Sequence, residues 1–136
     1  VVTMWHVLEH VFHLNRELIQ IKKVLKPKGK LIIAVPNCSS YDAVKYGEYW
    51  AAYDLPIHLY HFQPSDMAKF ADKHGFQVDK ILPMKYDAYY VSMLSEKYKK
   101  GTLLSALLTG FVSNWKALRK NNQYSSQIYI LSKKQG

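Results

Sequence analysis

Histidines and a glutamate near the start of the chain could bind a metal ion or carry a proton. The segment His6-Val7-Leu8-Glu9-His10 has the H-x-x-E-H spacing found in some zinc hydrolases. Such enzymes hold the motif on one long helix and add a third ligand from further along the chain. Here the motif directly follows an apolar, β-branched run, so only its second half can be helical. The pattern therefore gives little support to a zinc hydrolase.

Two further histidines lie in a long polar and aromatic segment, residues 38–63. An imidazole titrates near neutral pH, so His10, His58 or His61 could serve as a general base. We favour His58 and His61 as residues on the substrate side, because the loop that carries them would close the pocket, and long loops after parallel strands commonly carry function. In the alternative interpretation, Glu9 and His10 only form hydrogen bonds at the start of a helix.

The first third of the chain predicts a strand, a helix and a second strand. Residues 1–5 are apolar throughout, which predicts a strand buried on both faces. A helix should begin after Asn15, a good N-cap, and the second strand covers residues 31–35. Short links between them imply a right-handed crossover and a parallel sheet. Ligands of such sheets bind beyond the carboxyl ends of the strands, which lie here at Trp5-His6 and Pro36-Asn37.

The remainder of the chain predicts two more strands around a helical region. A helix over residues 66–74, capped by Ser65 and ended by Gly75, precedes a strand over residues 76–82. The region 86–120 reads as mostly helical, and a final strand covers residues 127–132. The predicted fold class is therefore α/β. Within the helical region one apolar stripe is expected: Leu104, Leu107, Leu108, Phe111, Trp115 and Leu118.

The composition indicates the cellular compartment and the charge of the partners, but it does not identify the substrate. The chain has 136 residues, a net charge of +9 and a single cysteine, Cys38. It can form no internal disulfide, which fits the cytoplasm, and the positive charge favours anionic partners. Residues 1–5 read as the middle of a strand, so we expect a piece of a longer protein.

Three segments in order resemble the C-terminal half of a class I S-adenosylmethionine-dependent methyltransferase. They are VVTMWHVLEHV, LKPKGKLIIAVPN and YDLPIHLYHFQPSDMAKFADKHGF, and the likeness covers residues 1–82 and, less clearly, 126–133. Within that family, the sequence is most similar to the branch that includes the quinone-biosynthesis O-methyltransferases and many other methyltransferases of small molecules. The resemblance implies part of a Rossmann-like fold over residues 1–136, with a closing antiparallel pair of strands and a helical insertion at residues 86–120. The implied reaction is methyl transfer to a small molecule, at a hydroxyl.

The resemblance also implies roles for particular residues. The family's glycine-rich loop would lie upstream, and the chain contains no G-x-G, so we expect this chain by itself to be inactive. A similar E-x-x-E-H segment in related enzymes resembles a divalent-metal site, although the nitrogen-rich set here would suit zinc better than magnesium. The expected residues are Trp5, His6 and Val7 for the cofactor; His10, His58 and His61 for catalysis; Asn37, Tyr41, Trp50 and Asp54 for substrate; and Glu9, His10 and His61 as the alternative metal ligands.

Other functions remain open at this point. An RNA methyltransferase with a His/Glu metal site would use the positive charge, but the basic residues are scattered and form no platform with aromatic residues. A non-catalytic interaction module derived from the fold is a third possibility. The helical region 86–120 could be a lid, a basic amphipathic element on an anionic membrane surface, a contact between two copies, or an ordinary helix packed on the core.

Overall fold

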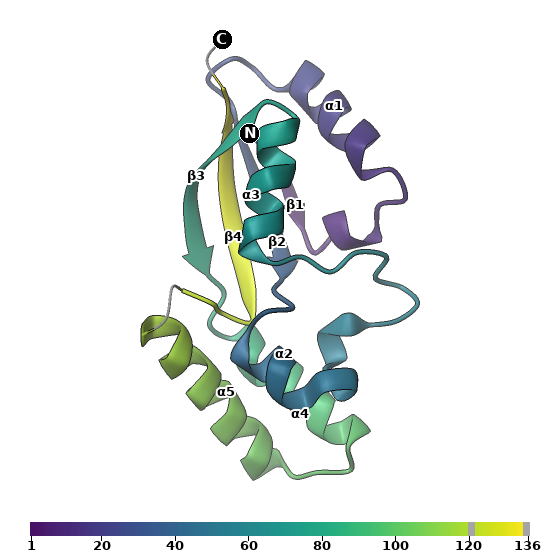
Figure 1. Cartoon of the computed structure of the whole chain (residues 1–136), viewed down its shortest axis with the longest axis vertical. Coiled ribbons are helices and arrows are strands. Elements are labelled where there is room, and N and C mark those ends of the chain that lie inside the picture. Colours follow the sequence, from purple (N-terminus) through teal and green to yellow (C-terminus); the bar gives the residue numbers. More distant parts are fainter. Residues whose placement is uncertain (120–121, 135–136) are drawn as a thin grey trace.

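A single four-stranded sheet with the order β1-β2-β4-β3 organises the chain. The computed structural model describes residues 1–119 and 122–134. β1 runs parallel to β2, whereas β4 is antiparallel to both β2 and β3. The predicted strand-helix-strand unit and the closing antiparallel pair are thus confirmed (Figure 1). The strands are β1, Val2–Trp5; β2, Lys30–Pro36; β3, Phe76–Pro83; and β4, Ser126–Lys133.

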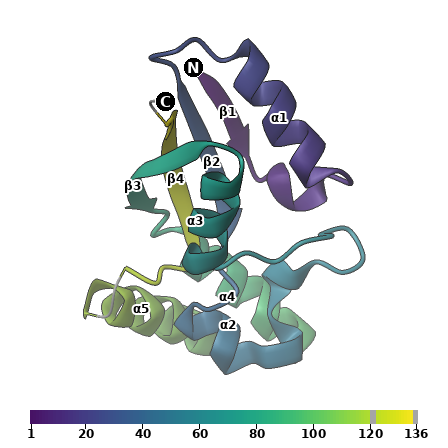
Figure 2. The same cartoon turned by 45° about the horizontal axis from the view of Figure 1, so that its top comes forward.

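Helices α1 (Leu14–Val24) and α3 (Pro64–Lys73) pack on the same face of this sheet (Figure 2). Alternate residues of the strands point into the space beneath them, where Leu31 is fully buried. Each large aliphatic side chain buried there contributes about 1.5–3 kcal/mol. This core fixes the helices on the sheet, and its helical members include Leu18, Ile21 and Met67.

The prediction that residues 1–5 are buried on both faces is wrong. Of the residues of β1, only Met4 is buried, and Trp5 is 50% exposed. β1 is an edge strand of the sheet. The face away from α1 and α3 is also less covered, since Ile32 and Ile130 are only partly buried. The apolar run reflects a strand that carries more hydrophobic surface than the described residues cover.

Two predicted helix caps are also wrong, although both helices are found. α1 has its N-cap at His13, and α3 has its N-cap at Gln63, so Asn15 and Ser65 lie inside the first turns. Pro64 follows Gln63 directly, and the fixed φ angle of proline suits the first helical position. Gly75 adopts a left-handed backbone with φ +74°, as expected for the residue that follows a helix.

Residues 41–53 form short helices, whereas residues 54–63, which carry His58 and His61, remain irregular as predicted. The short helices are α2 (Tyr41–Tyr46), η2 (Gly47–Tyr49) and η3 (Ala51–Tyr53), where η marks a 3₁₀ helix. Ser40 caps α2 by accepting a hydrogen bond from the Ala43 N–H at 3.3 Å. Their buried aromatic side chains form a second hydrophobic cluster with Val91. Tyr46 and Trp50 thus pack in one cluster with α4.

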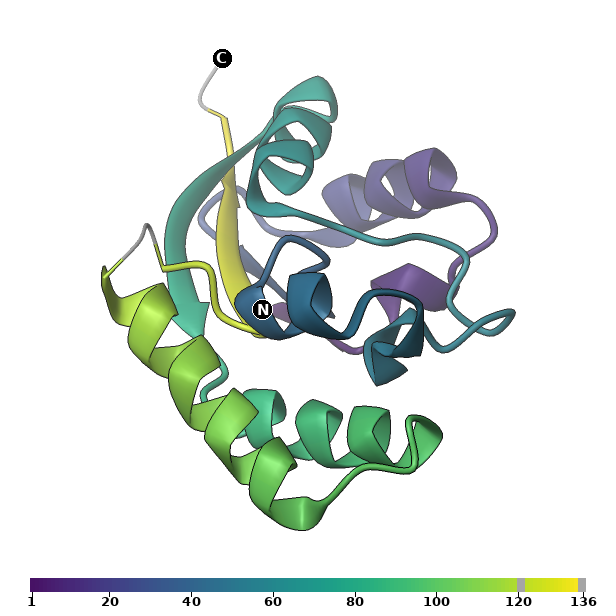
Figure 3. The ribbon, with the colours of Figure 1, turned by 60° about the horizontal axis from the view of Figure 1, so that its bottom comes forward.

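The helical region contains α4 (Asp87–Tyr98) and α5 (Leu103–Arg119), while Lys120 lies outside the described residues. The predicted helical character is confirmed. Figures 1 and 3 show α5 at the periphery, with α4 and α2 on its inner side. The predicted apolar stripe of α5 faces outward, so this helix does not pack its apolar side on the core. Among the described residues, no helix has the length and apolar character needed to cross a membrane.

Candidate active site

The chain leaves β1 through a sharp turn that gathers the predicted site residues. His6 has a left-handed backbone with φ 49°, and its N–H still donates to the carbonyl oxygen of Ala34 at 2.9 Å. A non-glycine residue in this conformation is uncommon and concentrates at functional sites. The turn leads into η1 (Leu8–His10), which places Glu9 and His10 just beyond the carboxyl end of β1.

The imidazole of His6 lies between two carboxylates. Its Nε2 atom is 3.4 Å from Oδ2 of Asp87, and its Nδ1 atom is 3.3 Å from Oε1 of Glu9. The hydrogen bond to Asp87, followed by the one to Glu9, raises the pKa of His6 to about 9. His6 is therefore a cation at neutral pH, with both ring nitrogens engaged, and is not available as a general base.

His58 approaches the same glutamate from the segment after η3. The N–H of Leu59 donates to the carbonyl oxygen of Glu9 at 2.8 Å and so ties this segment to η1. Nδ1 of His58 is 2.9 Å from the carbonyl oxygen of Ala52. A carbonyl oxygen only accepts, so Nδ1 carries the proton and neutral His58 has its lone pair on Nε2. That Nε2 atom lies 3.9 Å from Oε1 of Glu9.

His10 has the same arrangement of ring nitrogens. Its Nδ1 atom is 3.3 Å from the carbonyl oxygen of Ile57, which again leaves Nε2 as the free, proton-accepting nitrogen. The rings of His10 and His58 meet edge to face with centroids 4.6 Å apart. The structure thus brings two base-competent imidazoles together beside one carboxylate.

The Glu9 carboxylate is only half satisfied. Glu9 is 1% exposed, and its Oε2 atom has no hydrogen-bond partner within the described residues. A buried carboxylate oxygen without a partner is costly and calls for a water, a proton or a cation. One ligand atom each from Glu9, His10 and His58 lie within 4.8 Å of one another, a set that could hold a metal ion.

His61, the third predicted catalytic histidine, is held apart from this group. Its Nε2 atom is 3.0 Å from the carbonyl oxygen of Tyr53, and its ring packs edge to face on that tyrosine. The rings of His58 and His61 are 6.4 Å apart. The structure therefore groups His58, rather than His61, with Glu9 and His10.

Two of the four predicted substrate residues do not fit that role. Trp50 is 2% exposed, and its indole N–H donates to Oδ2 of Asp42 at 2.8 Å, so it belongs to the second hydrophobic cluster. Asn37 is 1% exposed, and its amide donates to the carbonyl oxygen of Tyr124 and the side chain of Gln123. Both side chains are saturated by internal contacts and have no free face for a ligand.

The other two predicted substrate residues are less buried. The Asp54 side chain is 45% exposed, and its Oδ2 atom is 3.9 Å from Nε2 of His58. The ring of Tyr41 lies beneath the ammonium of Lys116, which is 3.9 Å from the ring centroid. Asp54 thus borders the histidine pair, whereas Tyr41 contacts α5.

The family comparison covers more than half of the chain. A family model described as a methyltransferase domain matches residues 1–81. This chain belongs to the methyltransferase domain family. The predicted membership of the S-adenosylmethionine-dependent methyltransferase family is confirmed, while the activity, the acceptor and the branch stay predictions. No curated protein has a significant match to the chain.

Solved structures support a methyltransferase-like fold for this domain. The chain is similar to the [4+2]-cyclase SpnF, with a TM-score of 0.57, 14% identity, and coverage of 98% of this chain and 49% of that one. Phosphoethanolamine N-methyltransferase 2 of Haemonchus contortus, bound to S-adenosyl-L-methionine, is similar with a TM-score of 0.54 and 20% identity. That match covers 98% of this chain and 33% of the other. The cyclopropane synthase MmaA2 of Mycobacterium tuberculosis is similar with a TM-score of 0.54 and 13% identity. That match covers 96% of this chain and 54% of the other. The chain therefore spans between 33% and 54% of the length of these three structures.

The three predicted cofactor residues of the methyltransferase domain differ in the surface that they expose to a ligand. Trp5 and Val7 are 50% and 44% exposed beside the end of β1 and present open apolar surface. His6 has both nitrogens engaged by carboxylates, so it could meet a cofactor only through its ring face. The role of these three residues in cofactor binding stays a prediction.

Two acidic residues of this region were missed by the sequence analysis. Asp87 forms an ion pair with His6. In the sequence, Asp87 is marked only as an acid in the first turn of a helix, which is a weak signal. Asp42 is fully buried and accepts hydrogen bonds from Trp50, Ser113 and Ser125. Nothing in the local sequence pattern indicates that these distant groups meet.

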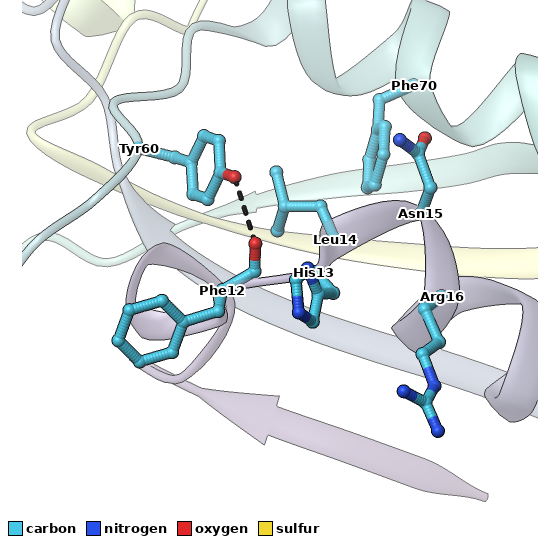
Figure 4. Close-up of a pocket in the computed structure, with 7 residues that line it drawn as sticks. All are labelled: Phe12, His13, Leu14, Asn15, Arg16, Tyr60 and Phe70. Carbon is cyan, nitrogen blue, oxygen red and sulfur yellow. Dashed lines mark hydrogen bonds between the residues drawn. The ribbon is translucent and has the colours of Figure 1, made fainter.

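A separate hollow of about 590 Å³ lies between the start of α1, α3 and the segment before α3. Figure 4 shows Tyr60 reaching across it, with its hydroxyl donating to the carbonyl oxygen of Phe12 at 3.3 Å. Leu14, Arg16 and Phe70 also line it. None of the catalytic candidates His10, His58 and His61 lines this hollow, so we assign it no part in the active site.

Proposed function

We propose that this methyltransferase domain transfers a methyl group to a hydroxyl of a small molecule, with His58 as the general base. The observation that carries the proposal is the His58 imidazole, whose Nδ1–H is held by Ala52 and whose Nε2 faces the buried Glu9. A backbone hydrogen bond that fixes the tautomer is the arrangement a positioned base needs. S-adenosylmethionine, when bound, supplies a methyl group already activated for transfer.

In this proposal the chain's own residues prepare the acceptor. Nε2 of His58 takes the hydroxyl proton, and the adjacent Glu9 carboxylate stabilises the imidazolium that forms. His10, stacked edge to face on His58, limits the movement of its ring. Trp5 and Val7 would wall the cofactor at the end of β1, and Asp54 would lie at the rim on the substrate side.

The experiment uses the longest protein that the gene encodes around this chain. Isothermal titration first measures binding of S-adenosylmethionine, and transfer of a radiolabelled methyl group is then measured to a panel of phenols and aliphatic alcohols. General-base catalysis contributes roughly a hundredfold or more, so His58→Gln should lower the rate by that factor without weakening cofactor binding. His13→Gln, at an exposed histidine of the same region, is the matched control.

Three results would count against this proposal. A folded protein that fails to bind S-adenosylmethionine contradicts the enzyme and favours a non-catalytic module. Methyl transfer that survives intact in His58→Gln contradicts the role of the base. Methylation of small RNA in place of every small molecule would favour the nucleic-acid alternative.

A second candidate is the same reaction assisted by a divalent cation at Glu9, His10 and His58. It is favoured by the unpartnered Glu9 Oε2 atom and by the two free Nε2 atoms. Histidines that ligate metals usually donate their other N–H to a carbonyl or carboxylate, as His10 and His58 do. Two nitrogens and one oxygen fit zinc better than magnesium.

A further inference from the structure

Helix α5 presents its apolar side to solvent and its polar side to the protein. The buried residues of this helix are small or polar, and no large aliphatic side chain is among them: Ala106, Thr109, Gly110, Ser113 and Ala117. A helix on a globular protein usually buries its apolar stripe. The stripe of α5 instead lies outside, with exposed fractions between 43% and 68%: Leu103, Leu104, Leu107, Leu108, Phe111, Trp115 and Leu118.

Specific contacts fix α5 in this orientation. The Ser113 hydroxyl donates to the buried Oδ1 of Asp42 at 2.6 Å, and the Lys45 ammonium donates to the hydroxyl of Thr109 at 2.5 Å. Gly110 allows close approach to α4, because a Cβ there would lie 2.6 Å from the Tyr89 ring. Rotation of the helix would break all three contacts, so the outward stripe is a fixed feature of the fold.

The stripe continues into a hollow of about 410 Å³ between α5 and the start of α4. Phe111, Trp115 and Leu118 line one side, and Lys85 and Tyr86 line the other. Contiguous exposed apolar surface of this kind marks an interaction site rather than an ordinary surface. Tryptophan and tyrosine at its border are the residues that favour the interface between lipid and water.

The exposed charges at the two ends of α5 are positive, whereas Glu96, which accepts a hydrogen bond from Ser105 of α5, is buried. The sequence contains no aspartate or glutamate after Glu96. Exposed cations lie at both ends of α5: Lys97, Lys99 and Lys100 before it, and Lys116 and Arg119 in its last turn. A basic rim around an apolar stripe matches an anionic surface with an apolar interior.

We propose that α5 docks the protein on the surface of an anionic membrane. The stripe enters the boundary between headgroups and acyl chains, Trp115 lies at headgroup level, and the basic residues contact lipid phosphates. Contact between two copies through this face is disfavoured, because it would bring the same cations together without acidic partners. This proposal is independent of the reaction carried out at the histidine pair.

The test is binding to phosphatidylcholine vesicles with and without phosphatidylglycerol, followed by co-sedimentation and tryptophan fluorescence. We expect binding to the vesicles with phosphatidylglycerol and a blue shift that Trp115→Phe removes. Loss of both cations in Lys116→Gln/Arg119→Gln should weaken binding about fivefold for each charge. Phe111→Gln should weaken binding about tenfold, since a large apolar side chain no longer enters the lipid.

Matched controls separate this surface from the rest of the molecule. Lys69→Gln/Lys73→Gln on α3 removes the same number of exposed charges, and Phe12→Gln removes an aromatic ring that is 77% exposed. Both controls should bind as the unmodified protein does. Absence of binding, or equal binding to both vesicles, would overturn the proposal. So would a dimer in solution that Phe111→Gln dissociates, since the stripe would then join two copies.

Discussion

Nε2 of His6 lies 3.4 Å from Oδ2 of Asp87, and this ion pair ties the end of the edge strand β1 to the first turn of α4. The two residues are far apart in the sequence, and their contact joins the sheet to the helical layer that carries the second hydrophobic cluster. The same imidazole contacts the buried Glu9, so its positive charge acts on a carboxylate of the candidate active site. His6 is thus a positioning cation beside the histidine pair.

The first prediction concerns the titration of His6. Its pKa is raised to about 9 by Asp87 and then Glu9, above the ordinary value of 6.5. The stabilisation is therefore fully present below pH 6.5 and is lost as the pH rises through about 9. Because the side chain is 39% exposed, solvent screening limits it to about 1 kcal/mol. NMR titration should give a midpoint near 9, and Asp87→Asn should lower it; an unchanged midpoint would contradict the ion pair.

The second prediction concerns the buried Asp42. This carboxylate accepts hydrogen bonds from Trp50 at 2.8 Å and from Ser113 and Ser125 at 2.6 Å each. Asp42→Ala would leave these donors without an acceptor and should destabilise the fold by about 3 kcal/mol or more. Urea unfolding measures the loss. The exposed Asp66, in the first turn of α3, is the control, and Asp66→Ala should cost less than about 1 kcal/mol.

The sequence predicts those features that depend on neighbouring residues better than those that depend on contacts between distant residues. Patterns within one element identified every strand and both helices of the main core, because alternation and helical spacing are local properties. The caps at Asn15 and Ser65 failed because Pro64 and the packing of Leu14 set the helix starts instead. The short helices within residues 41–53 were predicted as part of a loop because short helices have weak periodic signals.

The site was predicted only in its composition. Glu9, His10 and His58 are adjacent to strand ends or loops, which the sequence indicates, but their mutual geometry depends on backbone carbonyls of Ile57 and Ala52. Such contacts leave no mark in the residue pattern. The exposure of the α5 stripe was likewise unpredictable, since helical spacing reveals which residues share a face and not which way that face points.

The third prediction concerns Gly110 at the contact between α4 and α5. A Cβ at this position would lie 2.6 Å from the Tyr89 ring and 3.0 Å from the Tyr89 Cα. Overpacking should outweigh the better helix propensity of alanine, so Gly110→Ala should lose about 1–2 kcal/mol. Thermal unfolding measures this. Leu108→Ala, at a residue 56% exposed on the opposite face of α5, should change stability by about 0.5 kcal/mol or less.

The fourth prediction distinguishes a cation site from a purely organic base. If Glu9, His10 and His58 hold zinc, then a concentration of zinc about a hundredfold above the dissociation constant adds about 2.7 kcal/mol to the free energy of unfolding. For a domain of this size that corresponds to an increase in Tm of roughly 5–10 °C. Glu9→Gln keeps the shape but removes the anionic ligand, so it should abolish the increase. His61→Gln should retain it, because His61 is bound to Tyr53 and lies outside the ligand set. A Tm that zinc leaves unchanged, or an increase that Glu9→Gln preserves, would exclude zinc at this site and leave His58 to accept the proton unaided.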